Sequence, residues 1–443
     1  MLLACHHSRT TLDAALETFA SSMNTLSRQD KSLCHALVFG VLRRRGFLDH
    51  LITQFSDKPL EKLDLPVVYL LRMALFQLAC LDRIPDFAVI NTTVDIAKVC
   101  GARKAAGFIN AVLRKAAVNH KKIPIPGTKD SLPHLAIQYS LPQWLIKKWL
   151  DVYGIQGVKD ICQSINQIPP TILRTNTLKI SREKLVGMLD EKNIPHTPGK
   201  TPEAIILEQP GIPVSELPGF PEGYFQVQDQ AAQMVSHYLA PRPEERILDV
   251  CAGLGGKTFH MAQLMENQGE ITAMDVSPGK LKRLESESRR LGIQMVDTIC
   301  EDVRKVTSKD FSELFDRVLV DAPCTGLGVL RRNPDSRWKR SVKQIQNMAA
   351  RQKKILNAAA NLVRPGGILV FAVCSCEKEE THDVVDGFLA KRKDFTADPT
   401  MDQKNYWADL VQKSGRFATY PHALDMDGFF TARFRRTATG RLG

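Results

Sequence analysis

The sequence predicts a multidomain protein with an all-α N-terminal domain, a small α+β middle domain and a C-terminal α/β domain built on a mostly parallel sheet. Three observations predict this class. The 443 residues suffice for two or three domains of ordinary size. Helical periodicity runs through the first 120 residues without strand-like alternation. From about residue 229, short apolar runs alternate with helical patterns, which is typical of a doubly wound sheet.

The N-terminal domain, residues 1–125, is expected to be entirely helical. Its apolar residues recur at three- and four-residue spacing, as in Leu33, Leu37, Val38 and Val41. The stretch from His120 to Asp130 contains Lys, Pro and Gly but no apolar period. We interpret it as the first linker.

The middle domain, residues 126–228, mixes helix and strand signals. Helical patterns cover Trp144–Val152 and Ser181–Glu191. Three short apolar runs are typical of strands: Thr171–Asn176, Ala204–Leu207 and Tyr224–Val227. Frequent prolines between residues 195 and 221 indicate surface loops. A small α+β module is therefore expected here.

The C-terminal domain, residues 229–437, contains five short β-branched or apolar runs separated by helical patterns. The predicted strands are Arg246–Val250, Ile271–Asp275, Met295–Ile299, Arg317–Val320 and Ile368–Val373. An alternating run, Phe429–Phe434, predicts one more strand near the end. This order predicts a parallel sheet whose ligands bind at the carboxyl ends of the strands.

Composition narrows the class of protein. Sixty Lys and Arg against 48 Asp and Glu give a net charge of +12, which favours a polyanionic partner such as RNA or DNA, although a merely basic protein fits the charge as well. Ten dispersed cysteines form no Cys-x-x-Cys pair, so no zinc site is predicted and the thiols are expected to be reduced, as in the cytoplasm. The longest apolar stretch, Pro66–Leu81, contains Arg72 and Gln77, so no membrane span is expected. The start, Met1–Cys5, has no basic leader and no apolar core before the cysteine, so no signal peptide is expected.

A glycine-containing loop follows the first strand of the C-terminal domain. It runs from Asp249 to Thr258, and glycines there allow the backbone to turn sharply and approach a ligand. Asp275 ends the second strand, where a carboxylate can bind ribose hydroxyls, and Asp302 follows the third. A tight turn without a ligand explains the loop alone, but not the acids at the next two strand ends. Because nothing is arranged for a pyrophosphate, S-adenosylmethionine fits better than a dinucleotide.

Two cysteines follow the fourth and fifth predicted strands. The fourth runs into Asp321-Ala322-Pro323-Cys324, and the fifth ends at Cys374. A thiolate that adds to carbon 6 of a cytosine turns carbon 5 into a nucleophile for a methyl group. A carboxylate near ring nitrogen 3 would stabilise the adduct, and a second thiol could remove the proton from carbon 5. Small buried cysteines are common in protein cores, but two cysteines at neighbouring strand ends favour a catalytic role over a packing role. Cys376 is a rival nucleophile, less favoured because it lies further from the strand end.

At these residues the chain resembles the bacterial family of ribosomal RNA cytosine-C5 methyltransferases, with closest similarity to its small-subunit enzymes of the methyltransferase B type. The resemblance covers nearly the whole chain and rests on Asp249–Thr258, Asp321–Gly326, Ala372–Glu380 and Gly328–Asp335. It implies a Rossmann-like methyltransferase domain behind an N-terminal RNA-binding domain of the antitermination factor B (NusB) type. The departures, Gly253 and Leu254 in the cofactor loop, Val373 before the nucleophile and the extra Cys376, remove no group that the chemistry needs.

The resemblance also implies residue roles. Cys374 takes the role of nucleophile, Cys324 the role of releasing the product and Asp321 the third catalytic position. The implied S-adenosylmethionine positions are Cys251, Ala252, Gly253, Leu254, Gly255, Gly256, Lys257, Asp275, Asp302 and Asp321. The implied target is cytosine 967 of 16S ribosomal RNA, with transfer RNA or another ribosomal site as alternatives. A monomeric enzyme in the cytoplasm is expected. A noncatalytic RNA-binding or ribosome-assembly factor with a vestigial fold is the alternative. Methylation of an exocyclic amine is disfavoured because Ala322-Pro323-Cys324 replaces the turn typical of those enzymes.

Basic residues are expected to hold the RNA. They gather at Lys280–Arg290 and at Arg331–Arg340, where Trp338 offers a stacking face, and Arg43–Arg45 suits phosphate contact in the N-terminal domain. A solvated helix face is the common explanation for any single cluster. The target base must be unstacked or flipped before a thiol can reach it.

Overall fold

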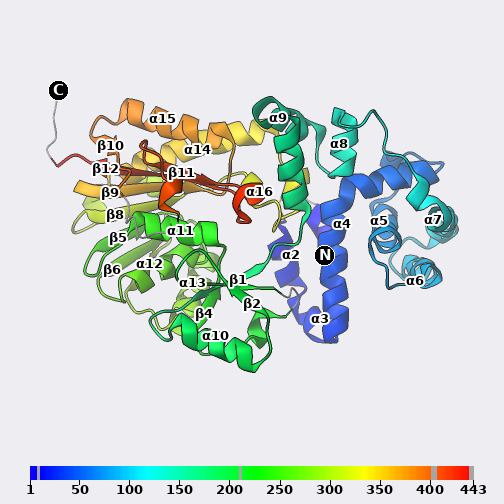
Figure 1. Ribbon diagram of the computed structural model, residues 1–443, viewed down its shortest axis with the longest axis horizontal. Helices are drawn as coiled ribbons and strands as arrows, with labels where there is room; N and C mark the ends of the chain where they lie inside the picture. The colour runs from blue at the N-terminus through cyan, green and yellow to red at the C-terminus, as the bar shows by residue number, and fades with distance from the viewer. Residues whose placement is uncertain (7–9, 209–211, 401–406, 439–443) are drawn as a thin grey trace. The chain divides into compact units, whose positions relative to one another are not determined.

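The computed structural model describes residues 1–6, 10–208, 212–400 and 407–438, and the chain divides into two compact units (Figure 1). One unit contains residues 1–167 together with 330–340, and the other contains residues 168–329 and 341–443. The domain boundaries expected at residues 125 and 228 stay predictions. None of the helices in the described part of the chain is long and apolar enough to cross a membrane.

The first unit is helical, as predicted. Its helices are α1 (Leu2–His6), α2 (Leu12–Thr18), α3 (Ala20–Asn24), α4 (Arg28–Phe55), α5 (Leu65–Cys80), α6 (Asp86–Val99), α7 (Ala106–Asn119), α8 (Leu132–Gln138) and α9 (Gln143–Asn166). Buried apolar side chains of α4 to α7 form its core. Arg72, buried in α5, donates two hydrogen bonds to Asp49 of α4, at 2.6 and 2.9 Å. This bidentate pair satisfies a charge that interrupts the apolar face of α5.

Helix α9 is longer than the pattern predicted. The expected helix ended at Val152, whereas α9 continues to Asn166 across a kink at Gly154. Gly154 has φ +65°, a left-handed conformation that glycine adopts without strain. The helical period therefore restarts after the glycine, which is why a continuous pattern could not be followed through it.

The middle module contains a four-stranded antiparallel sheet in the order β2-β3-β1-β4. Its elements are β1 (Thr171–Thr175), α10 (Arg182–Glu191), β2 (His196–Pro198), β3 (Ala204–Leu207) and β4 (Phe225–Val227). The three predicted strands and the helix are present. Strand β2 was expected to be loop because of its prolines, but it lies at the sheet edge, where Pro198 needs no N–H to donate.

The C-terminal domain is built on an eight-stranded sheet in the order β10-β12-β9-β8-β5-β6-β7, with β11 paired to β12. Its strands are β5 (Arg246–Asp249), β6 (Glu270–Met274), β7 (Val296–Ile299), β8 (Phe315–Asp321), β9 (Val363–Val373), β10 (Phe395–Ala397), β11 (Arg416–Thr419) and β12 (Phe429–Arg436). The neighbours from β9 to β7 are parallel. The carboxyl ends of β5, β8 and β9 therefore meet at one edge of the sheet.

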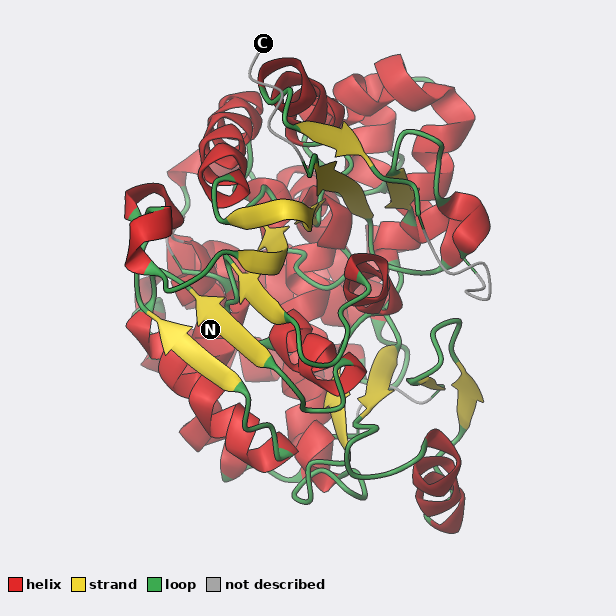
Figure 2. Ribbon diagram, turned by 90° about the vertical axis from the view of Figure 1, so that its left-hand side faces the viewer, coloured by secondary structure: helices red, strands yellow, loops and turns green. Residues whose placement is uncertain are grey.

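Helices cover both faces of this sheet (Figures 1 and 2). Its helices are α11 (Gln230–Leu239), α12 (Gly256–Leu264), α13 (Pro278–Leu291), α14 (Val342–Ala360), α15 (His382–Lys391) and α16 (Pro421–Leu424). Apolar side chains of α11, α12 and α13 pack with Ile247 and Leu319 on one face, and those of α14 and α15 pack with Leu248 and Val320 on the other. Alternate strand residues thus serve two cores, which explains why these strands are apolar throughout.

Strand β12 confirms the strand predicted over Phe429–Phe434 and continues to Arg436. Its polar residues Thr431 and Arg433 are buried like their apolar neighbours. The reason is that β12 lies inside the sheet, antiparallel to β9, β10 and β11. Arg433 is accommodated because its guanidinium donates to the carbonyls of Tyr238 and Thr400.

Candidate active site

The cofactor loop joins β5 to α12 through a sharp turn that requires glycine. Gly253 and Gly255 both have positive φ, at +60° and +86°. A Cβ on Gly255 would lie 2.5 Å from the ring of Phe259 and 2.9 Å from Leu284, so no side chain fits there. The N–H of Gly253 donates to Asp275 at the end of β6, at 3.0 Å. The loop is thereby fixed across two parallel strand ends.

Acidic side chains stand at three successive strand ends along this edge. Asp249 ends β5, Asp275 follows β6 and Asp302 follows β7. Asp249 accepts a hydrogen bond from Thr258 with one oxygen, while its other buried oxygen has no partner among the described residues. Burial raises the pKa of Asp249 to about 7, whereas the hydrogen bond from Arg304 holds the pKa of Asp302 at about 2.

These acceptors match the donors of S-adenosylmethionine, which carries an ammonium group and two ribose hydroxyls. The unpaired oxygen of Asp249 is an independent sign that a donor belongs here, because a buried polar atom without a partner is costly. Cys251 to Lys257 form the loop and the first turn of α12, as expected. Burial raises the pKa of Cys251, which keeps it a neutral thiol. The residues present therefore fit this cofactor.

Lys257 links the cofactor loop to the end of β8, where the turn that contains Cys324 begins. Its Nζ lies 2.6 Å from Oδ2 of Asp321 at the end of β8, and 5.0 Å from the ring centre of Phe429. Burial disfavours the charge on Lys257, but Asp321 outweighs burial, so the pKa of Lys257 is raised. An electrostatic interaction with Cys374 acts in the same direction. Lys257 is thus a cation paired with Asp321, with Cys374 within electrostatic range.

The two predicted thiols converge. Sγ of Cys324, in the turn after β8, lies 3.0 Å from Sγ of Cys374, directly after β9. Both cysteines are free, and the separation exceeds the length of about 2.05 Å of a disulfide bond. The hydrogen bond with Cys374 and burial hold the pKa of Cys324 well above its ordinary value. Cys324 is therefore a neutral thiol at neutral pH.

Cys376, the rival nucleophile, has a different environment. Its thiol points toward the carbonyl of Thr419, at 3.8 Å, and packs against Gly428, where a Cβ would lie only 2.9 Å from the sulfur. Burial raises the pKa of Cys376. Contact with Cys324 and interaction with Lys257 both belong to Cys374, so the geometry favours Cys374.

Glu380, to which no role was assigned from the sequence, has no exposed area and contacts both cysteine turns. Its Oε1 accepts from the N–H of Thr325 at 2.8 Å and from Nε2 of Gln352 at 3.0 Å. Its Oε2 accepts from the hydroxyl of Ser375 at 2.7 Å and from the hydroxyl of Thr325. Thr325 and Ser375 directly follow Cys324 and Cys374. Glu380 ends the segment Ala372–Glu380 on which the family resemblance rests, and that was the signal that could have drawn attention to it.

Arg174 of β1 was also missed as a site residue, although it lay in a predicted strand. It is fully buried and donates to the carbonyl of Gly256 at 2.6 Å, at the start of α12. It also donates to the side chains of Gln226, Gln228 and Gln263. Arg174 therefore fastens the cofactor loop to the middle module.

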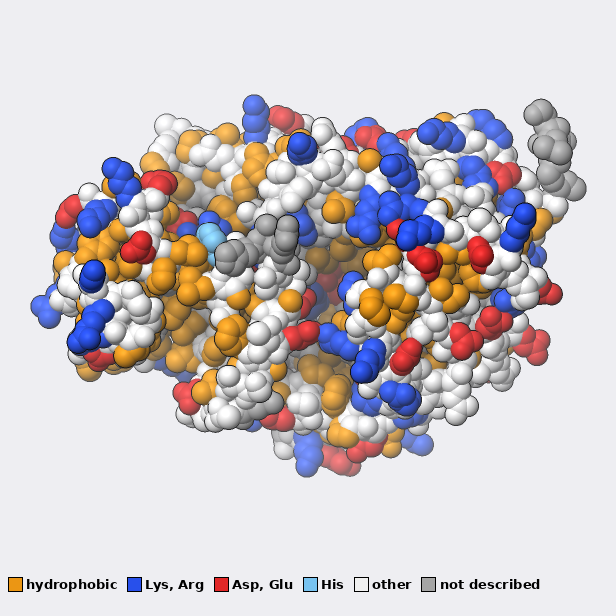
Figure 3. Space-filling view, turned by 180° about the vertical axis from the view of Figure 1, so that it is seen from behind, with side chains coloured by type: hydrophobic (Ala, Val, Ile, Leu, Met, Phe, Trp, Pro, Cys, Tyr) orange, Lys and Arg blue, Asp and Glu red, His pale blue; other side chains and the backbone are white. Residues whose placement is uncertain are grey.

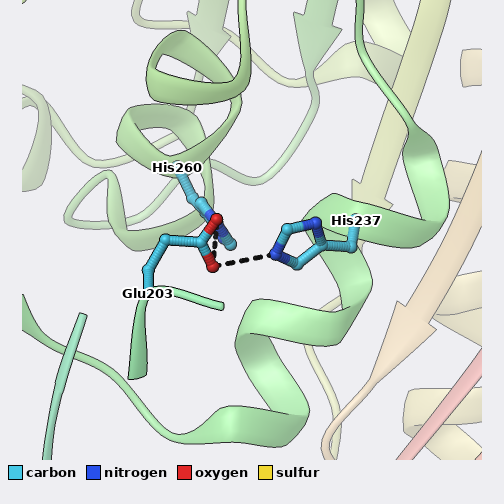
Figure 4. Close-up of side chains that lie close together, drawn as sticks. All are labelled: Glu203, His237 and His260. Atoms are coloured by element: carbon cyan, nitrogen blue, oxygen red, sulfur yellow. Dashed lines mark hydrogen bonds and ion pairs between the residues drawn. The ribbon is translucent and has the colours of Figure 1, made fainter. Parts of the chain in front are cut away.

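Glu203, His237 and His260 form a second polar cluster, with side chains that point toward one another (Figure 4). Their nearest ligand-type atoms all lie within 4.8 Å of one another. Oε2 of Glu203 is 3.0 Å from Nε2 of His237 and 3.8 Å from Nε2 of His260. Two imidazoles and a carboxylate are a ligand set suited to zinc or a similar ion.

The surroundings favour a hydrogen-bonded cluster over a metal centre. The contact of 3.0 Å between Glu203 and His237 is an ordinary hydrogen bond, satisfied by a proton. Burial and then the charge of Arg174 lower the pKa of His260 to about 3, and the same charge would repel a divalent cation. Burial lowers the pKa of Arg174 to about 9, and Glu203 opposes that shift. Glu203 therefore serves as the counter-charge of Arg174.

The pKa of His260 gives a test of stability against pH. The unfolded chain binds a proton on this histidine below about pH 6.5, whereas the folded chain excludes it down to about pH 3. Stability is thus full above this window and falls as the pH is lowered through it, by up to about 1.4 kcal/mol per pH unit. His260→Gln is expected to flatten this dependence. Urea unfolding at about pH 7.5 and about pH 5 measures it, with His196→Gln as control. An equal loss of stability in all three proteins would contradict the assignment.

Several basic residues expected to bind RNA are instead structural. Arg43 and Arg337 are buried: Arg43 donates to the carbonyl of Arg331, and Arg337 donates to the carbonyls of Arg43 and Ile165. The ring of Trp338 lies under Arg45, and its N–H donates to Leu42. The segment 330–340 packs within the helical unit because guanidinium groups satisfy carbonyl groups there. Arg45 covers one face of the partly exposed Trp338, and the stacking role of Trp338 stays a prediction.

Other basic residues remain exposed. On α13 these are Lys280, Lys282, Arg283 and Arg289, whereas Arg290 donates to the carbonyls of Phe220 and Phe225. Figure 3 shows Lys and Arg side chains scattered in groups over one face of the molecule, among acidic and apolar ones. Among the described residues, Lys280, Lys282 and Arg289 are exposed members of the predicted basic surface that can contact a polyanion.

Three family models match successive parts of the chain: the N-terminal helices, the middle module and the C-terminal domain. The sequence model of the family "16S rRNA methyltransferase RsmB/F" matches residues 236–435. That of the NusB family matches residues 1–118, and that of the ferredoxin-like domain of RsmF/B-like methyltransferases matches residues 141–215. The helical N-terminal domain is thus NusB-like, and the middle module is ferredoxin-like.

Individual relatives match over most of their length. Ribosomal RNA small subunit methyltransferase B of Escherichia coli O6:K15:H31 is 35% identical over 412 residues, which cover 92% of this chain and 91% of that protein. The crystal structure of PH0851 has a TM-score of 0.83 and 28% identity, covering 96% of this chain and 94% of the other. NSun6 from Pyrococcus horikoshii, solved with SFG, has a TM-score of 0.60 and 25% identity over 67% of this chain and 98% of its own.

Proposed function

Because the chain belongs to the RsmB/F family of 16S rRNA methyltransferases, we propose that it methylates carbon 5 of a cytosine in 16S ribosomal RNA, with cytosine 967 as the target. The methyl donor of the family is S-adenosylmethionine. One observation carries the choice of carbon 5. Two free thiols from neighbouring strand ends lie 3.0 Å apart beside the pair Lys257–Asp321. Methylation of an exocyclic amine would need no thiol at all.

The reaction divides between the two cysteines. The thiol of Cys374 adds to the cytosine: its sulfur bonds to carbon 6, its proton passes to ring nitrogen 3, and the enamine so formed makes carbon 5 nucleophilic. Bound S-adenosylmethionine supplies the electrophilic methyl group. The small fraction of Cys324 that is ionised then takes the proton from carbon 5. The electron pair of that C–H bond restores the double bond between carbons 5 and 6, and Cys374 leaves as a thiolate.

Asp321 and Lys257 support these steps. Addition of sulfur to carbon 6 shifts charge toward ring nitrogen 3, where a carboxylate can accept the N–H of the adduct. Asp321 ends β8 and precedes Cys324 by three residues, so in the sequence it is the carboxylate nearest to that turn. Lys257 holds Asp321 by its ion pair and interacts with Cys374. We assign Asp321 to binding the base and Lys257 to orienting Asp321.

The pH dependence of turnover follows from the role of Cys324. A proton acceptor must be deprotonated, but the hydrogen bond with Cys374 and burial raise the pKa of Cys324, so its thiolate is scarce near neutrality. When release limits turnover, kcat is expected to rise by up to about tenfold per pH unit above neutrality. Steady-state rates between about pH 6.5 and about pH 9 measure this. A kcat that falls with rising pH in a stable protein would exclude Cys324 as the base.

The other parts of the chain fit an RNA substrate. We propose that the NusB-like and ferredoxin-like modules bind the RNA around the target, that the enzyme acts as a monomer and that it works in the cytoplasm. The net charge of +12 and the exposed basic face of α13 support binding of a polyanion. The base must still leave its stack to reach the thiols.

The direct test is incubation of unmodified 16S rRNA with the protein and S-adenosylmethionine, followed by bisulfite sequencing. We expect one new 5-methylcytosine, at position 967. A single product elsewhere would correct the target but not the chemistry. Tight RNA binding without any 5-methylcytosine would instead support the noncatalytic alternative, and a methylated exocyclic amine would refute the thiol mechanism.

A further inference from the structure

Glu380 is a charged group buried among neutral partners. Its four hydrogen bonds come from Thr325, Gln352 and Ser375, and no cation pairs with it in the part of the chain that the structure describes. A buried carboxylate is costly unless its oxygens are well bonded. Movement of any one donor would leave a buried carboxylate oxygen without its hydrogen bond, at a large cost in free energy. The network therefore resists displacement of the two cysteine turns.

The network is stronger on the side of Cys324. Thr325 contributes two of the four bonds, through its N–H and its hydroxyl, whereas Ser375 contributes one. Nε2 of Gln352 also donates to the carbonyl of Pro323, at 3.0 Å. The residues on both sides of Cys324 are thus tied to the same cluster. Loss of the carboxylate should displace Cys324 more than Cys374.

The proposed reaction requires the sulfur of Cys324 to lie at a fixed short distance from the sulfur of Cys374. Carbons 5 and 6 are neighbouring ring atoms, so the sulfur that removes the proton must stay close to the sulfur already bound to carbon 6. The contact of 3.0 Å between the thiols provides that spacing. A thiol is only a weak hydrogen-bond donor, so the contact cannot hold itself. The spacing must be imposed by the turns on which the cysteines lie.

We propose that Glu380 is a positioning residue that holds Cys324 over the methylated base and thereby sets the rate of product release. The inference rests on the proposed function, since it assigns a partner to one step of that reaction. Glu380 touches neither substrate nor cofactor in this scheme. It acts only through the turn from Pro323 to Thr325.

The test compares wild type, Glu380→Gln and the neighbouring control Glu379→Gln, which removes the same charge from a partly exposed position. Glutamine keeps the shape of Glu380 but turns one acceptor into a donor. We expect kcat to fall by roughly tenfold to a hundredfold, the cost of a reacting group displaced by about an ångström. KM for RNA and for S-adenosylmethionine should change by less than about threefold. A covalent protein–RNA complex should accumulate on denaturing gels, which a general loss of structure would not produce.

A second pair of variants keeps the test decisive if Glu380→Gln folds poorly. Thr325→Val removes a donor on the Cys324 side, and Ser375→Ala removes one on the Cys374 side. Thr325→Val is expected to accumulate the covalent complex, and Ser375→Ala to accumulate less of it. Equal accumulation in the two, or none in either, would overturn the proposal.

A double variant separates this inference from the proposed function. If Glu380 acts through Cys324, adding Glu380→Gln to Cys324→Ala should not change the yield of covalent complex further. Wild-type kcat in folded Glu380→Gln, a slow variant without covalent complex, or a further change in the double variant would each overturn the positioning role. Absence of 5-methylcytosine with wild type and of covalent complex with Cys324→Ala would refute the proposed function instead.

Discussion

Replacing Cys374 with alanine is expected to abolish methylation, with kcat reduced by about four orders of magnitude or more, as when other enzymes lose their nucleophile. Without the sulfur that adds to carbon 6, carbon 5 is too poor a nucleophile to accept the methyl group. Lys257 and Asp321 would remain paired, so the cofactor loop should keep its structure. Transfer of radiolabelled methyl groups to 16S rRNA measures the loss, and filter binding checks that RNA affinity is retained.

The matched control is Cys376→Ala, which removes a thiol only two residues further along the chain. Cys376 points to the carbonyl of Thr419 and packs against Gly428, so its loss should lower stability slightly and leave most of the activity. The reverse pattern, with Cys376→Ala inactive and Cys374→Ala active, would exchange their roles. Loss of activity in both variants with normal melting temperatures would show that the two thiols act together.

The placement of both cysteines on one edge of the sheet could be predicted because it depends mainly on the order of the strands. In a doubly wound sheet the strands before Cys324 and Cys374 are neighbours, and β8 and β9 do pair in parallel, with Asp321 opposite Ala372. The strand-end rule then places both cysteines on one edge. Their separation of 3.0 Å was not predictable, since it depends on the turns that follow the strands.

The partners of buried charges could not be predicted from sequence. Arg337 and Glu380 both have no exposed area, yet each looks like a surface residue in a linear pattern. Arg337 is satisfied by carbonyls on α4 and α9, which lie far away in the sequence. Glu380 is satisfied by donors on two turns and on α14. Such burial depends on tertiary structure, so the burial of Arg331 and Arg337 within the basic run Arg331–Arg340 could not be predicted.

The kink in α9 shows that the end of a helix could not be predicted from the local sequence either. Gly154 signals a break within a helical pattern, but the sequence does not say whether the helix ends there or restarts. The structure restarts it, and Val158, Ile161 and Ile165 pack inward after the break. The predicted helix therefore ended at Val152, two residues before the kink, because the continuation of α9 depends on apolar burial further along the chain.

The largest qualitative effect is expected from Cys324→Ala, which should convert the enzyme into a trap for its own substrate. Cys374 can still add and the methyl group can still transfer, but the proton on carbon 5 then lacks its acceptor, so the bond between sulfur and carbon 6 persists.

A slowly migrating protein–RNA band should therefore appear on a denaturing gel, depend on S-adenosylmethionine and disappear in the double variant with Cys374→Ala. Alanine also removes the hydrogen bond to Cys374 without leaving a buried charge, so folding should be retained. The yield of the band should approach one RNA per protein, because the protein cannot turn over. Multiple turnovers by Cys324→Ala at the wild-type rate would mean that another group accepts the proton, and the contact between the two thiols would then need a different explanation.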